Sequence, residues 1–193
     1  MSQSEKKREL FDHGSFNKFV DEFKNESDRA AVVLGAAKLD LVLYQIIQAY
    51  LIPTSTGKDE LLDGDSPLGT FSSKINICYR LGLIDSEFAR ALHLVRKIRN
   101  SFAHEVSDCT LVNGAHSDRV RELCLSFRNI EEYSRFKKSY FGDEDNPSID
   151  FRATLAIMVG RLEYYLQSIS TVTPIETKTF LVGSCDINGV RPR

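Results

Sequence analysis

The sequence lacks the segments that would direct a protein into a membrane or a secretory pathway. Its longest uncharged apolar run, from Leu41 to Ile52, is shorter than the ~20 residues that a spanning helix needs. The polar stretch from Met1 to Leu10 has no apolar h-region of the kind found in secretory signals. We therefore expect a cytoplasmic protein that does not enter a membrane.

Cysteine is scarce, and its spacing excludes the common metal-binding motifs. Cys78, Cys109, Cys124 and Cys185 include no Cys-x-x-Cys pair, and no histidine stands at zinc-finger spacing. The chain also has no phosphate-binding glycine loop, no Gly-x-Ser-x-Gly elbow and no His-Glu-x-x-His motif. The acidic triplet at 143–145 lacks the alternating ligands of a calcium loop. The sequence predicts reduced thiols, no bound metal and no cofactor.

No excess of positive charge indicates binding to nucleic acid by the whole molecule. The 25 lysines and arginines face 27 acidic residues, for a net charge of −2, so any such binding must be local. The most basic exposed helix expected, residues 119–138, is interrupted by Glu122, Glu131 and Glu132. Sequence-specific DNA binding is therefore the least favoured function.

What the sequence does contain is helical periodicity along most of its 193 residues. Apolar spacing, capping residues and prolines predict helices at about 15–24, 27–52, 66–82, 86–103, 117–140 with a bend near Asn129, and 147–170. Together they predict an all-α bundle of about five to six helices, with 1–170 as a single domain. An irregular C-terminal tail, 171–193, follows, either as an arm lying on a partner or as a disordered segment.

The predicted helix 86–103 contains an arginine in an unexpected place. On a helical wheel counted from Phe88, the apolar positions fall between about 320° and 40°, and Arg99 falls near 20°. A guanidinium on an apolar stripe needs a carboxylate, backbone oxygens or a bound anion, and Asp28 and Asp40 are candidates. The alternatives are a purely structural ion pair or an extended side chain that reaches solvent.

Two further residues make Arg99 a candidate site rather than an isolated oddity. Asn100 and His104 stand four residues apart, on one helix face, where an amide can orient an imidazole. His104 lies about 140° from Arg99 on a straight helix, so the two converge only if the helix ends near Phe102 or a second copy completes the site. Arg96 and Lys97 are candidate nucleic-acid contacts, although such basic clusters are more often solvated helix faces.

The segment around these residues resembles a known family. Arg99-Asn100-Ser101-Phe102-Ala103-His104 fits the Arg-x4-His pattern of the HEPN superfamily. A longer stretch is similar to its mannitol-repressor-like (MltR) branch, in Leu61-Leu62-Asp63-Gly64-Asp65, Pro67-Leu68-Gly69, Ser72 to Lys74, Tyr79 to Ile84 and the Arg99/His104 ending. This resemblance covers roughly a quarter of the chain.

The resemblance implies a helical homodimer in which the motifs of two protomers face one groove. In catalytic HEPN proteins such a groove cleaves RNA without a metal. His104 would exchange a proton with the ribose 2′-hydroxyl or the leaving oxygen, Arg99 would hold the phosphate, and Asn100 would orient His104 or the phosphate. The leading hypothesis is therefore a homodimer that binds RNA, with candidate metal-independent endoribonuclease activity.

The alternative is a non-catalytic, MltR-like transcriptional regulator or protein-interaction module that binds a protein partner. In that case the same residues stabilise the dimer. If Arg99 forms an ion pair with a buried carboxylate, Arg99→Ala should lower the free energy of unfolding by about 2–4 kcal/mol.

Overall fold

Seven α-helices, and no strand, make up the part of the chain that the computed structural model describes, residues 13–105 and 109–175. They are α1 (His13–Lys24), α2 (Asp28–Tyr50), α3 (Phe71–Arg80), α4 (Ser86–His104), α5 (Gly114–Arg128), α6 (Glu131–Tyr140) and α7 (Pro147–Leu166). The all-α class is confirmed. The helix count exceeds the predicted five to six because one predicted helix is two.

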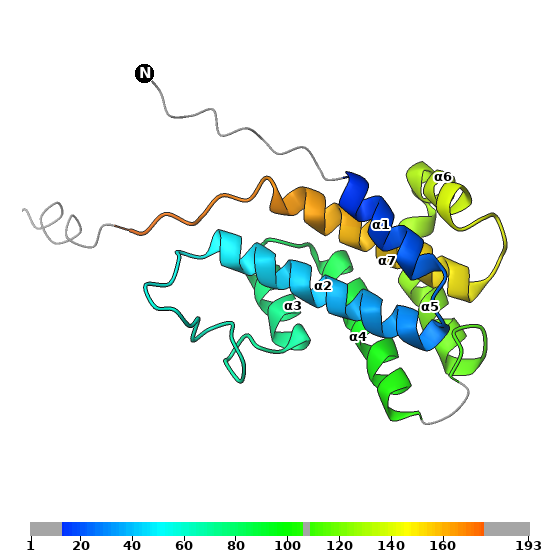
Figure 1. Ribbon diagram of the computed structural model, residues 1–193, viewed down its shortest axis with the longest axis horizontal. Coiled ribbons are helices and arrows are strands. Elements are labelled where there is room, and N and C mark those ends of the chain that lie inside the picture. The colour runs from blue at the N-terminus through cyan, green and yellow to red at the C-terminus, as the bar shows by residue number, and fades with distance from the viewer. Residues whose placement is uncertain (1–12, 106–108, 176–193) are drawn as a thin grey trace, which may run out of the picture.

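Helix α2 is the centre of the bundle (Figure 1). It packs against α7, α4 and α3, while α5 and α6 pack on α7. Gly35 lets α2 pack tightly against α7, since a Cβ atom there would lie 2.9 Å from Leu155 Cδ1. The fully buried large side chains of the core include Leu39, Leu43, Ile46, Ile47, Leu92, Ile98, Phe102, Phe151 and Leu123. The buried apolar residues of α2, Leu39, Leu43, Ile46 and Ile47 among them, thus belong to the core of the bundle.

By length and composition alone, α2 is the one described helix that could cross a membrane. The uncharged run from Leu41 to Ile52 had predicted no spanning helix, because it is shorter than α2 as a whole. Half of the qualifying window is buried inside the bundle, and the core helix of a soluble protein passes the same test. We therefore interpret α2 as a core helix, and the cytoplasmic location stays a prediction.

The prediction that α3 begins at Ser66-Pro67 is wrong. The helix begins at Phe71, where Thr70 and Ser73 form a reciprocal capping box. The residues before it form hydrogen-bonded turns, in which the Leu68 amide donates to the Leu61 carbonyl at 2.9 Å. Gly69 permits this geometry, because a Cβ atom there would lie 2.2 Å from the Gly64 carbonyl oxygen. The capping box therefore overrides the weaker Ser-Pro signal.

The single bent helix predicted over 117–140 is also wrong. Helix α5 ends at Arg128, and α6 starts at Glu131 after a break at Asn129 and Ile130. The break lets α6 turn onto α7, where Tyr133 is buried. Without the break, a single straight helix would have carried residues 131–140 along the axis of α5 instead of turning them onto α7.

The final helix ends at Leu166, before the predicted position 170. Beyond it, the Val172 amide donates to the Tyr50 carbonyl at 2.8 Å, so residues 171–172 run beside the end of α2. The predicted arm or disordered tail otherwise falls largely outside the described residues. The division into a domain at 1–170 and a tail at 171–193 remains a prediction.

Candidate functional site

Arg99 does not lie in a buried seam, which corrects the expectation drawn from the helical wheel. Its side chain is exposed, and its Nη1 donates to Asn100 Oδ1 at 3.1 Å. The two carboxylates considered as its partners are engaged elsewhere: Asp28 pairs with Arg152 at 3.0 Å, and Asp40 pairs with Lys74 at 2.7 Å.

The error has a geometric cause. The wheel placed the apolar stripe between about 320° and 40°, but the buried positions of α4 also include Ala91, Ile98 and Leu94, at about 300°, 280° and 240° on that wheel. The buried residues of α4 are Ala89, Ala91, Leu92, Leu94, Val95, Ile98 and Phe102. Their centre lies about 60° from Arg99 on the same wheel, because α5 covers α4 as well as α2 and α3 do.

The structure brings Arg99 and Asn100 together but does not join them to His104. His104 is the last residue of α4 and is exposed, and no hydrogen bond in the described chain connects it to either residue. Arg96 is half-buried and Lys97 is exposed on the same helix. The catalytic roles of Arg99, Asn100 and His104, and the nucleic-acid contacts of Arg96 and Lys97, therefore stay predictions.

Arg99 instead lines a groove between α2, α3 and α4. The groove has a volume of about 340 Å³ and is lined by Ala36, Ala37, Asp40, Leu41, Tyr44, Phe71, Lys74 and Arg99. Lys74 forms its floor: its side chain is only 7% exposed, and its Nζ lies 5.9 Å from the centre of the Tyr44 ring. Lys74 and Asp40 pair with each other. Arg99, on the wall of the groove, therefore has no carboxylate partner in the described chain.

An exposed apolar surface continues from this groove along α2. We call it the α2 face and define it as Val33, Leu34, Ala37 and Leu41. The three larger side chains are 46%, 48% and 50% exposed. No charged residue occurs in α2 between Ala30 and Ala37. Scattered apolar residues on a surface are ordinary, but a contiguous row beside a groove indicates a contact surface.

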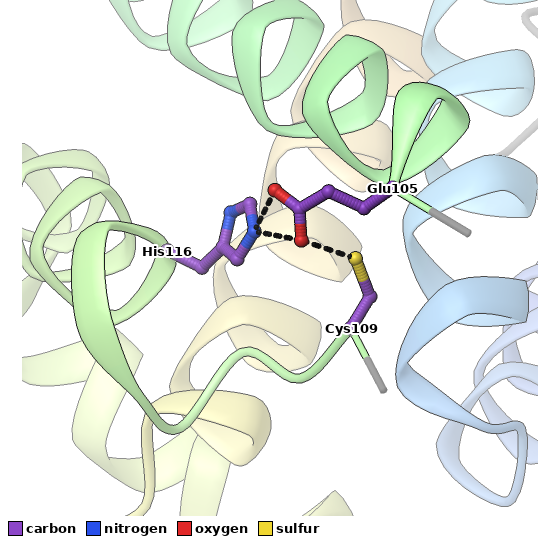
Figure 2. A group of neighbouring side chains, drawn as sticks. All are labelled: Glu105, Cys109 and His116. Atoms are coloured by element: carbon purple, nitrogen blue, oxygen red, sulfur yellow. Dashed lines mark hydrogen bonds and ion pairs between the residues drawn. The ribbon is translucent and has the colours of Figure 1, made fainter. Parts of the chain in front are cut away.

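A second group of side chains, which sequence reasoning missed, lies around the connection between α4 and α5, with His116 near the start of α5. Glu105, Cys109 and His116 converge there (Figure 2). Cys109 Sγ donates to Glu105 Oε2 at 2.7 Å, and His116 Nε2 lies 3.0 Å from Glu105 Oε1. The signal available in the sequence was Glu-x3-Cys-x6-His, three ligand types within twelve residues. The spacing of the four cysteines predicted a reduced thiol at Cys109 and did not connect it with His116.

The seven packed helices define the class of this protein, an all-α helical bundle, here with an open groove beside α2. No protein-family model matches the chain, and no curated protein matches it. A solved structure with a similar fold is the MtlR–HPr complex from Escherichia coli, in which MtlR matches with a TM-score of 0.53 and 17% sequence identity. The match covers 79% of this chain and 99% of that chain.

At this identity the likeness concerns the fold alone. It supports an MltR-like fold, and membership of the HEPN superfamily stays a prediction.

Proposed function

We propose that this protein is a non-catalytic interaction module that binds a protein partner through the α2 face and the adjoining groove. The observation that carries the proposal is the α2 face itself, three large apolar side chains about half exposed on a core helix. Protein interfaces combine such an apolar centre with a polar rim. Arg99 and Asp40, which line the adjoining groove, supply that rim here.

The fold likeness supports the same proposal. The similar MtlR was solved in a complex with HPr, which is a protein partner. The partner that suits the present surface has an apolar patch and an acidic side chain positioned to meet Arg99. A role in transcription regulation, as in the MltR family, would then be exerted through that partner, since no DNA-reading helix is evident in residues 13–105 and 109–175.

The first test changes the α2 face without disturbing the core. We expect Leu41→Glu to weaken partner binding by more than about tenfold, because a charge would be buried at the apolar centre of the interface. The matched control is Leu125→Glu, since Leu125 is 65% exposed on α5, a helix that packs on α4 and α7. Isothermal titration with purified HPr as the first probe measures the effect, followed by crosslinking to cell proteins from residue 41 and residue 125.

Arg99 provides a second variant on the same surface. Because its side chain is exposed and, among the described residues, is hydrogen-bonded only to Asn100, Arg99→Ala should change the free energy of unfolding by less than about 0.5 kcal/mol. This replaces the larger loss expected for a buried arginine.

Partner binding that is equal in wild type, Leu41→Glu and Leu125→Glu would contradict the proposed surface.

Metal-independent RNA cleavage makes a different prediction. The geometry favours it less, because no described contact joins His104 to Arg99 within one chain. We therefore expect labelled RNA to survive incubation in EDTA with wild type and with His104→Ala alike. Cleavage by wild type that disappears in His104→Ala would replace our proposal with the endoribonuclease hypothesis. Light scattering on the same samples tests the predicted homodimer.

A further inference from the structure

The cluster in the α4–α5 connection has the donor set of a transition-metal site. A thiol, an imidazole nitrogen and a carboxylate all lie within 4.8 Å of one another. In a tetrahedral zinc site, with Zn–S near 2.3 Å and Zn–N near 2.0 Å, ligand atoms are ~3–4 Å apart. Small side-chain rotations would therefore bring the three ligand atoms around one ion.

The ligand types select the metal. Thiolate and imidazole together favour zinc over magnesium or calcium, which prefer oxygen ligands only. The carboxylate adds a third ligand, and a water molecule can complete the tetrahedron. We propose that Glu105, Cys109 and His116 bind a zinc ion that fastens the connection between α4 and α5. This proposal is independent of the partner-binding surface.

His116 is already oriented for this role. It is 9% exposed, and its ring packs against Phe102 with centroids 4.7 Å apart. Its Nε2 faces Glu105, while its Nδ1 is buried without a hydrogen-bond partner in the described chain. Because Nδ1 is unpaired in either tautomer, a metal at Nε2 would create no additional unpaired group.

Two side chains of α2 fix the backbone around the other two ligands, Glu105 and Cys109. Arg29 donates to the Phe102 carbonyl at 2.9 Å and to the Glu105 carbonyl at 2.6 Å, which pins the chain where α4 ends. Asp28 accepts the Leu111 amide at 2.8 Å, which pins the chain two residues after Cys109. The ligands are thus placed by anchored segments on both sides, which reduces the conformational entropy lost on binding an ion.

Binding of a cation would also change the protonation of the cluster. Burial, and then the hydrogen bond and charge of Glu105, raise the pKa of the Cys109 thiol. A zinc ion would reverse this, because it binds the thiolate and releases the thiol proton to solvent. One proton should therefore leave for each ion bound near neutral pH.

The test uses the full chain after removal of bound metal with a chelator. Titration with Co²⁺, which takes zinc's place in thiolate sites, should produce a near-ultraviolet sulfur-to-metal charge-transfer band that saturates at one ion per chain. Zn²⁺ should abolish the band by displacing Co²⁺, and calorimetry should give a micromolar or tighter dissociation constant for Zn²⁺.

Variants decide whether the site is the one proposed. Cys109→Ser should eliminate the band, and Glu105→Gln should weaken Zn²⁺ binding by more than about tenfold. Both residues are at least partly exposed, so these variants should fold as wild type does. The matched controls, Cys78→Ala and His93→Gln, remove a thiol and an imidazole outside the cluster and should bind like wild type. A band that persists in Cys109→Ser, or the absence of saturable binding in wild type, overturns the proposal.

Discussion

Replacing Asp150 with alanine should lower the free energy of unfolding by about 3–5 kcal/mol, the largest loss that we expect from any single substitution considered. Asp150 lies in the first turn of α7, and its side chain is only 3% exposed. It pairs with Lys137 Nζ at 2.7 Å and with the guanidinium of Arg128. Tyr133 also donates a hydrogen bond to it.

The reason for the large effect is the cation left behind. The Lys137 side chain is 14% exposed, so without Asp150 its ammonium would stay buried with no carboxylate to compensate it. The pair also joins α6 to α7, so its loss should loosen the packing of α6 first. Urea denaturation followed by circular dichroism measures the change.

Asp143→Ala is the matched control for this prediction. Asp143 pairs with Lys138, but the two side chains are 77% and 71% exposed, and a surface pair of this kind contributes less than about 1 kcal/mol. If Asp150→Ala unfolds within about 1 kcal/mol of wild type, Lys137 reaches solvent when unpaired, and our interpretation of the α6–α7 contact is wrong.

The second large effect should come from Asp28→Ala, which we expect to lose about 3 kcal/mol. Asp28 begins α2, and one of its oxygens pairs with Arg152, a guanidinium whose side chain is 7% exposed. The other oxygen accepts from the Leu111 amide and the Thr110 hydroxyl. The residue therefore connects α2, α7 and the segment before α5.

Asp28 also gives the loss a specific pH dependence. Burial by itself would raise its pKa, but hydrogen bonds from Leu111, Ser148 and Arg152 outweigh burial and lower the pKa below its ordinary value. Its contribution is therefore fully present above the unfolded pKa, about 4, and is lost as the pH falls through the folded value.

Denaturant unfolding at several pH values tests this directly. Wild type and Asp28→Ala should differ by a constant amount from about pH 7 to 5, and the difference should shrink below about pH 4. Asp21→Ala, which removes an exposed partner of Lys24, should show neither effect. A difference that stays constant down to pH 3 would contradict the assignment.

Much of the helical content could be predicted because its causes are local. Ser27 caps α2 by accepting from the Ala30 amide, and Asp85 caps α4 by accepting from the Phe88 amide. Pro147 opens α7 as expected, and the Asn146 side chain caps it by accepting from the Ser148 amide. These signals act within one turn of helix, so no knowledge of the neighbours is needed.

The candidate site was predicted less well, because burial depends on neighbours. Arg99 sits beside apolar positions on a wheel, yet only the packing of α5 shows which arc of α4 is covered. The α2 face presents the opposite case, since Val33, Leu34 and Leu41 belong to a continuous apolar pattern but remain outside the core. Periodicity indicates which residues are apolar, and it does not indicate which of them a second helix will cover.

By itself, then, the sequence determined an all-α protein and the approximate course of most of its helices, since apolar spacing, caps and prolines act over a few residues. Only the tertiary structure decided that Arg99 is exposed and that Glu105, Cys109 and His116 meet. Arg29 and Asp28, more than seventy residues earlier in the chain, hold the segments that carry Glu105 and Cys109. Contacts across such a separation depend on how whole helices pack, which local patterns do not encode.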